Sequence, residues 1–160
     1  MWEIVKLSDI CLKITDGSHN PPKGVDSSEY VMLSSKNVLD DEITYKKPRY
    51  LIKDDYISEN KRTDIKEGDV LLTIVGTIGR SAVVKKEHKP FTLQRSVAVL
   101  KPNHSLVNSR FLMYRLHSML AMLNDGARGV AQKGIYLKSI KALEIELPSL
   151  TEQQRIVARL

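Results

Sequence analysis

The sequence predicts an α+β domain that is rich in β-strands, contains one packed amphipathic helix and leads into a C-terminal helix. Three observations predict this class. Apolar β-branched runs of strand length fill the middle of the chain, leucines with helical spacing follow them, and a helix-capping sequence opens the tail. The chain has 160 residues, the length of one domain, and its hydrophobic content of 42% is ordinary for a globular protein.

The N-terminal third offers few clear elements. Residues 15–24 predict a turn or long loop, because Gly, Asn and two consecutive prolines stand close together there. Residues 30–34 have the length and composition of a short strand. The polar segment 40–61, with its interspersed tyrosines, predicts only short irregular elements.

The middle of the chain predicts strands. Glu67-Gly68-Asp69 is a turn signal, and the apolar run at residues 70–75 is typical of a buried strand. Two glycines interrupt the run before it resumes at residues 81–84, so two neighbouring strands joined by a glycine-bearing turn are expected. A third strand is expected over residues 91–100.

An amphipathic helix is expected after Asn108, which is a favourable N-cap residue. Apolar residues recur there with the spacing of one helix face, and the helix is expected to end near residues 124–126. The residues of this stripe are Leu112, Leu116, Met119, Leu120 and Leu123.

The tail predicts a half-exposed strand over residues 143–147, followed by a capping box at residues 149–152 that opens a second helix. We therefore divide the chain into a domain at residues 1–147 and the start of a longer helix at residues 148–160. The apolar side chains of that helix are expected to be exposed in a monomer and to need a partner. They are Ile156, Val157 and Leu160.

Charge is distributed unevenly along the chain. Residues 1–79 carry a net charge of −3 and residues 142–160 a net charge of −1. Residues 80–141 hold 12 Lys and Arg against 2 Asp and Glu, a net charge of +10. A block so poor in acid suits a surface that faces a polyanion such as nucleic acid. The alternative is a basic face that contacts only solvent.

Several classes of protein are excluded. The single Cys11 cannot form an internal disulfide, and the four histidines show no zinc-ligand spacing. The N-terminus lacks the apolar segment of a signal peptide, and no stretch approaches the ~20 apolar residues of a membrane span. A cytoplasmic protein with no membrane partner is therefore expected.

The catalytic motifs are incomplete. Lys23 follows an Asn-Pro-Pro sequence at the position where amino-methyltransferases need an aromatic ring. Residues 76–81 lack both the spacing and the lysine of a P-loop. The sequence therefore predicts no active site, no metal site and no cofactor on this chain.

Polar side chains suited to bases and phosphates stand at or near glycine-bearing turns. Arg and Gln can read guanine and adenine bidentately in the major groove, and glycine lets the backbone approach a phosphate. The candidate DNA-binding residues are Arg80, Gln94, Arg95, Arg128, Gln132, Lys133, Tyr136 and Lys138. The alternative for the segment at residues 125–134 is a flexible, solvated basic loop.

Four segments stand in a characteristic order: TDGSH at residues 15–19, GDVLLTIVGTIG at 68–79, QRSVA at 94–98 and LPSLTEQQRIV at 147–157. Together they resemble one target recognition domain of the DNA specificity subunit of type I restriction-modification systems. The resemblance implies a non-catalytic subunit that binds one half of a bipartite double-stranded DNA target. It also implies docking to a modification (methyltransferase) subunit and a restriction subunit, with AdoMet, ATP and Mg²⁺ bound by those partners.

The resemblance covers one recognition domain and the beginning of a spacer helix, where the family has two such domains. It therefore leaves open a fragment or a half-subunit that pairs with a second copy or a second recognition domain. The residues that match family motifs and are interpreted as loop-shaping are Asp16, Gly17, Gly76 and Gly79. Two other functions remain as alternatives: a small nucleic-acid-modifying enzyme, such as a nuclease or methyltransferase fragment, and a domain that binds an acidic protein.

Overall fold

The computed structural model describes residues 1–119 and 134–160. The strands are β1 (Glu3–Lys6), β2 (Cys11–Asp16), β3 (Tyr30–Leu33), β4 (Val38–Leu39), β5 (Glu42–Ile43), β6 (Arg49–Leu51), β7 (Val70–Thr73), β8 (Ser81–Val83), β9 (Phe91–Leu93), β10 (Val97–Pro102) and β11 (Glu144–Leu147). The helices are α1 (Leu7–Ile10), α2 (Lys53–Thr63), α3 (Ser109–Ser118), α5 (Leu137–Lys141) and α6 (Leu150–Val157), with a 3-10 turn, η1, at Ser35–Asn37. The predicted α+β class is confirmed.

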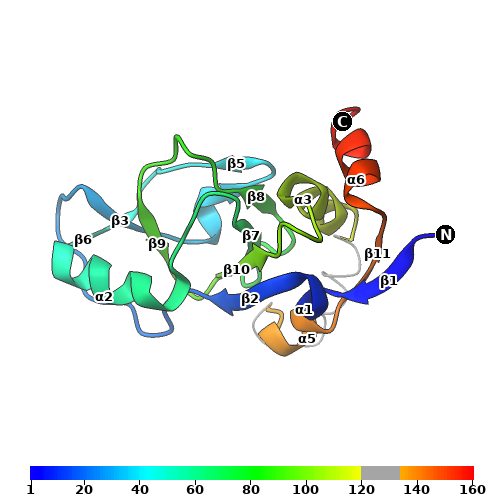
Figure 1. Ribbon diagram of the computed structural model, residues 1–160. Coiled ribbons are helices and arrows are strands. Elements are labelled where there is room, and N and C mark those ends of the chain that lie inside the picture. Colours follow the sequence, from blue (N-terminus) through cyan, green and yellow to red (C-terminus); the bar gives the residue numbers. More distant parts are fainter. Residues whose placement is uncertain (120–133) are drawn as a thin grey trace.

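Two sheets form the body of the domain. Strands β2, β10, β7 and β8 pair antiparallel in that order. Strands β6, β3 and β9 form the second sheet, in which β9 runs parallel to β3. Figure 1 shows the second sheet with α2 at the left and the β1–β11 ribbon with α6 at the right, where both chain ends lie. Helix α6 therefore leaves the domain at the end far from α2.

The first sheet is buried on both faces. Along β7, Val70 and Leu72 contribute to a core with α3, whereas Leu71 contributes to a second core with β3 and β9. Because neighbouring residues of a strand point to opposite faces, a strand between two cores must be apolar throughout. The prediction of a buried strand at residues 70–75 is confirmed.

The glycine-bearing turn and the capped helix are confirmed as well. Strand β8 pairs antiparallel with β7, and Gly76 and Gly79 between them have φ angles of +80° and +94°. The Oδ1 atom of Asn108 accepts hydrogen bonds from the amides of Arg110 at 2.9 Å and Phe111 at 3.1 Å. Helix α3 ends at Ser118, and its expected end near residues 124–126 lies outside the described residues.

The prediction of one strand over residues 91–100 is wrong. The segment forms two strands in different sheets, β9 beside β3 and β10 between β2 and β7. A turn separates them, closed by the hydrogen bond from the Val97 amide to the Gln94 carbonyl at 3.2 Å. Gln94 and Arg95 therefore lie in a turn instead of opening a strand.

Helix α2 also departs from the prediction, because it fills much of the segment expected to be irregular and adds a second packed helix. Asp54 and Asp55 stand in its first turn and Lys61 and Arg62 in its last, an arrangement that favours the helix dipole. The helix carries few apolar residues, and its contacts are with β9, β2 and β3. A mostly polar helix of this kind lacks the stripe by which α3 was found.

The tail follows the predicted order of strand, proline and capped helix. The Oγ atom of Ser149 accepts a hydrogen bond from the Glu152 amide at 3.2 Å, and α6 begins at the next residue after the cap. Ile156 and Val157 are half-buried against the first core, so the prediction that they are exposed is wrong for these two. Leu160 is 70% exposed. The division of the chain at residue 147 stays a prediction.

Candidate nucleic-acid interface

Five loop segments meet at one end of the first sheet, and Ser96 joins three of them. Its carbonyl accepts a hydrogen bond from the Ile74 amide at 2.9 Å, at the end of β7. Its Oγ atom accepts a hydrogen bond from the Ser35 amide at 3.0 Å, in the loop after β3. These bonds hold the turn between β9 and β10 against the end of β7 and against the loop after β3.

The backbone at Arg80 is fixed by Thr73, which is fully buried. The Arg80 amide donates to the Thr73 Oγ1 atom at 2.9 Å, and the Arg80 carbonyl accepts from the Thr73 amide at 2.9 Å. The Gly79 amide donates to the Thr73 carbonyl at 3.0 Å, which closes the glycine-bearing turn. The Arg80 side chain is half-exposed and forms no ion pair with the residues that the structure describes.

The turn that carries Gln94 and Arg95 is held from two sides. The Gln94 amide donates to the Leu33 carbonyl at 2.9 Å, and the Arg95 amide donates to the Ser18 carbonyl at 3.0 Å. The Arg95 side chain is exposed and has no ion-pair partner within residues 1–119 and 134–160. Gln94 is half-exposed.

Arg80 and Arg95 lie close to one another across the end of β7. Arg80 bonds to β7 from the side of β8, and Ser96, next to Arg95, bonds to it from the side of β10. Two steps between neighbouring strands place the backbones of Arg80 and Ser96 about 10 Å apart. The structure thus brings together two arginines that are separated by fourteen residues of sequence.

Tyr136 and Lys138 follow a segment that runs along the same strand end. Gly134 bridges to Val75, and the Ile135 amide donates to the Ile74 carbonyl at 2.9 Å. Tyr136, which is 74% exposed, caps α5, and Lys138 in that helix is exposed. The remaining candidates, Arg128, Gln132 and Lys133, lie outside the described residues.

Two of the residues interpreted as loop-shaping make tight local contacts. Asp16 is buried and accepts a hydrogen bond from the Arg62 Nη2 atom at 2.6 Å, and its carboxylate contacts the His19 ring at 2.8 Å. A Cβ atom on Gly17 would lie 2.2 Å from the carbonyl oxygens of both Leu93 and Gln94. These contacts support the interpretation of Asp16 and Gly17 as residues that shape the loop.

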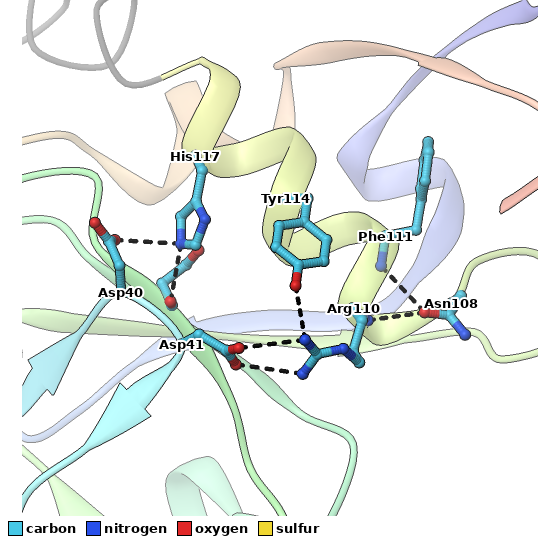
Figure 2. Close-up of polar contacts among 8 residues, drawn as sticks. Asp40, Asp41, Asn108, Arg110, Phe111, Tyr114 and His117 are labelled. Carbon is cyan, nitrogen blue, oxygen red and sulfur yellow. Dashed lines mark hydrogen bonds and ion pairs between the residues drawn. The ribbon is translucent and has the colours of Figure 1, made fainter. Parts of the chain in front are cut away.

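Part of the basic block is neutralised by acidic residues from the N-terminal half. Figure 2 shows Arg110 of α3 facing Asp41, with its Nη2 atom 3.2 Å from Oδ2, while His117 faces Asp40 at 3.2 Å. Partial burial disfavours the charged form of Arg110, but the hydrogen bonds and charge of Asp41 outweigh it and raise the pKa of Arg110 above its ordinary value. Lys101 likewise pairs with the buried Asp69 at 2.6 Å. These basic residues stabilise the fold and are poor candidates for DNA contacts.

Sequence reasoning missed two residues that build the interface. The Ser96 side chain accepts a hydrogen bond from the distant loop after β3, and the Thr73 side chain accepts one across the β7–β8 turn. A serine or threonine inside an apolar run gives no sequence signal for such a bond, because its partner is set by strand register. Lys36, which is exposed in η1 next to Ser35, was also missed as a further cation near these turns.

The described residues, with the gap at 120–133, hold no group of three or more His, Cys, Asp or Glu that could bind a metal ion. In the same ranges no helix is long and apolar enough to cross a membrane.

Comparison with solved structures shows which proteins share the fold. The chain superimposes on an HsdS subunit from Thermoanaerobacter tengcongensis with a TM-score of 0.67 and 22% identity, covering 99% of this chain and 36% of that one. It superimposes on a type I restriction-modification S subunit from M. genitalium with a TM-score of 0.69 and 16% identity, covering 99% of this chain and 38% of that one. At these identities the likeness concerns the fold alone.

Curated relatives and a family model add sequence similarity. The chain is 36% identical over 101 residues to the EcoBI specificity subunit of Escherichia coli, covering 62% of this chain and 21% of that protein. It is 30% identical over 115 residues to a Haemophilus influenzae protein named as a type I restriction enzyme specificity subunit, covering 71% of this chain and 29% of that protein. The chain thus spans less than a third of the length of either relative. The model of the type I restriction modification DNA specificity domain matches residues 1–160, and the chain belongs to that family.

Proposed function

We propose that this chain recognises a sequence in double-stranded DNA, as one recognition unit of a type I specificity subunit that reads one half of a bipartite target. Membership of the DNA specificity domain family supports DNA as the ligand. The observation that carries the proposal in this molecule is the pair formed by Arg80 and Arg95, which have no ion-pair partner in the described residues and stand on turns fixed by backbone hydrogen bonds.

The spacing of the two arginines suits a short stretch of base pairs. Bases along one strand are 3.4 Å apart, so a separation of about 10 Å corresponds to about three base pairs. An arginine can donate two parallel hydrogen bonds to guanine, and Gln94, next to Arg95, can donate one hydrogen bond to adenine and accept another from it. Tyr136 and Lys138 stand beside this group as candidates for sugar and phosphate contacts.

In this proposal the chain performs no chemistry and binds no cofactor. A modification (methyltransferase) subunit and a restriction subunit supply catalysis with AdoMet, ATP and Mg²⁺ in the cytoplasm. Helix α6 begins the spacer that reaches a second copy or a second recognition domain. The exposed apolar side chains near the two chain ends support a docking role there, namely Trp2, Ile4 and Leu160.

Selection from a pool of duplexes with a randomised core tests the proposal. Specific binding predicts that repeated rounds enrich a short common sequence, and that the selected duplex binds more tightly than a scrambled one at every salt concentration. A pool that stays random after selection, with equal affinities for all duplexes, would remove sequence recognition as the function of this chain.

Alanine at Arg80 or at Arg95 is expected to weaken binding to the selected duplex by about 1 to 3 kcal/mol and binding to a scrambled duplex much less. The bidentate contact distinguishes bases, so its loss removes discrimination more than affinity. Fluorescence anisotropy with both duplexes measures the difference. Lys6→Ala is a control, because Lys6 is exposed on β1 in the other part of the domain. Equal losses on both duplexes would reassign the arginine to a phosphate contact.

The purified chain is expected to leave DNA uncut and unmethylated when AdoMet, Mg²⁺ and ATP are supplied. Transfer of a labelled methyl group and gel analysis of the duplex measure the two activities. Turnover that copurifies with the chain and follows its concentration would favour the alternative of a small nucleic-acid-modifying enzyme.

A further inference from the structure

A second basic surface lies at the other end of β8 and makes no use of the candidate residues above. It is a groove of about 330 Å³ between the β8–β9 loop and the segment before β7. Lysines line it from both sides, Lys66 from one segment and Lys85, Lys86 and Lys89 from the other, and Tyr56 of α2 lines it as well. We propose that this groove binds the phosphate backbone of duplex DNA next to the recognised bases, a proposal that rests on the proposed function.

The loop that carries three of the lysines is held in place. The His88 amide donates to the Lys85 carbonyl at 3.1 Å, and the His88 Nδ1 atom accepts a hydrogen bond from the Lys85 amide at 2.8 Å. The Tyr45 hydroxyl donates to the Lys89 carbonyl at 2.8 Å, and the Tyr45 ring meets Phe91 edge to face at 6.2 Å. The backbone that supports these ammonium groups is therefore preorganised for a ligand, which reduces the entropy lost on binding.

The charge of the groove is available to an anion. Lys85, Lys86 and Lys89 form no ion pair with the described residues, whereas Lys66 lies 3.3 Å from the exposed Asp64. Glu67 is the acidic residue that lines the groove. Four lysines face three carboxylates, of which Asp64 pairs with Lys66 and Glu87 stands in the lysine loop. Lys85, Lys86 and Lys89 therefore leave a small positive excess in a partly enclosed space, where their field is less screened than on a flat surface.

His88 adds a neutral donor. Because Nδ1 accepts the Lys85 amide, the ring proton is on Nε2, which can donate to a phosphate oxygen. Burial lowers the pKa of His88 and so keeps the ring neutral near pH 7, with the nearby charge of Lys85 acting in the same direction and that of Glu87 opposing both. His88 therefore provides a spectroscopic probe inside the groove.

The distance between the groove and Arg80 allows one DNA duplex to contact both. Arg80 precedes β8 and Lys85 follows it, five residues further along an extended strand. At about 3.3 Å per residue the two ends are about 16 Å apart, close to the length of five nucleotides along one DNA strand. A duplex lying along β8 would present bases to Arg80 and phosphates to the groove.

The test compares two variants of equal net charge. Lys86→Gln/Lys89→Gln removes two groove lysines, and Lys6→Gln/Arg159→Gln removes two exposed basic residues, one on β1 and one just after α6. Affinity for the selected duplex and for a scrambled duplex is measured at several salt concentrations. The groove variant is expected to bind both duplexes more weakly than the parent, by the same factor. The slope of log K against log salt is expected to fall by about two units in magnitude, since each phosphate contact contributes about 0.9. The control is expected to keep the parent slope.

Nuclear magnetic resonance of the His88 ring separates DNA from small phosphates. The ring signals are expected to move on addition of the scrambled duplex in the parent, and to stay unmoved by inorganic phosphate at the same phosphate concentration. Movement with inorganic phosphate, combined with an unchanged salt slope in the groove variant, would reassign the groove to a small anion and overturn the DNA proposal.

Failure of this proposal is distinguishable from failure of the proposed function. If the groove variant binds both duplexes like the control while Arg80→Ala loses discrimination, the groove contacts only solvent and sequence recognition stands. If the groove variant weakens binding while the parent has no sequence preference, the groove binds DNA and sequence recognition is wrong.

Discussion

Gly17→Ala is expected to destabilise the domain by about 3 kcal/mol or more, which lowers the melting temperature by roughly 6 to 12 °C. The added Cβ atom would lie 2.2 Å from two backbone carbonyl oxygens, those of Leu93 and Gln94. Neither segment can move freely, because the Gly17 amide donates to the Val97 carbonyl at 3.2 Å and the Ser18 amide donates to the Leu93 carbonyl at 2.8 Å. Relief of the clash therefore requires separating β2 from the turn that carries Arg95. Thermal unfolding followed by circular dichroism measures the effect.

Gly76→Ala is the matched control, since it tests backbone strain without a clash. Gly76 has a φ angle of +80°, and a Cβ atom there would lie 3.6 Å from the Ser35 Oγ atom, an ordinary van der Waals contact. The left-handed conformation costs about 1 to 2 kcal/mol for an alanine. We expect Gly17→Ala to lower the free energy of unfolding clearly more than Gly76→Ala does. Equal effects would mean that the loop at Gly17 relaxes without separating from the β9–β10 turn.

The features that the sequence predicted correctly are those specified by neighbouring residues. Asn108 and Ser149 cap helices through amides two or three positions ahead, and the turn at Gly76 and Gly79 needs left-handed backbone that glycine adopts at little cost. The strand run at residues 70–75 is apolar because both its faces are buried. Such signals are local and can be read without knowing the fold.

The features that were missed depend on contacts between distant segments. Residues 91–100 read as one strand because no glycine or proline marks the turn at Gln94, whose amide donates instead to the Leu33 carbonyl of β3. The charge separation along the sequence does not persist in space, because Asp41 and Asp69 reach into the basic block and pair with Arg110 and Lys101. Sequence reasoning could therefore propose Arg80 and Arg95 individually, but the register of β7 is what brings them together.

Gln153 is another residue whose role depends on contacts between distant segments. Its side-chain hydrogen bonds hold α6 against the rest of the domain. Its side chain is fully buried at the start of that helix. The Oε1 atom accepts a hydrogen bond from the Asn108 amide at 2.7 Å, and the Nε2 atom donates to the carbonyls of Leu106 at 3.0 Å and Pro148 at 2.9 Å. One amide group thus satisfies polar atoms from the residue before the cap of α6, from the loop before α3 and from the N-cap of α3.

Gln153→Leu is expected to destabilise the domain by about 3 kcal/mol, because it keeps the volume of the side chain but leaves one amide and two carbonyls without partners. Denaturant unfolding measures the loss, and hydrogen exchange is expected to show faster exchange in α6 and in the first turn of α3. Gln154→Leu is the control: Gln154 is exposed, and its replacement is expected to change stability by less than about 0.5 kcal/mol. Gln153→Glu keeps the acceptor for the Asn108 amide but turns a carboxylate oxygen toward two carbonyl oxygens. We therefore expect this variant to be no more stable than Gln153→Leu. A glutamate variant as stable as the parent would mean that the two donated hydrogen bonds contribute nothing, and that α6 is held by the apolar contacts of Ile156 and Val157 alone.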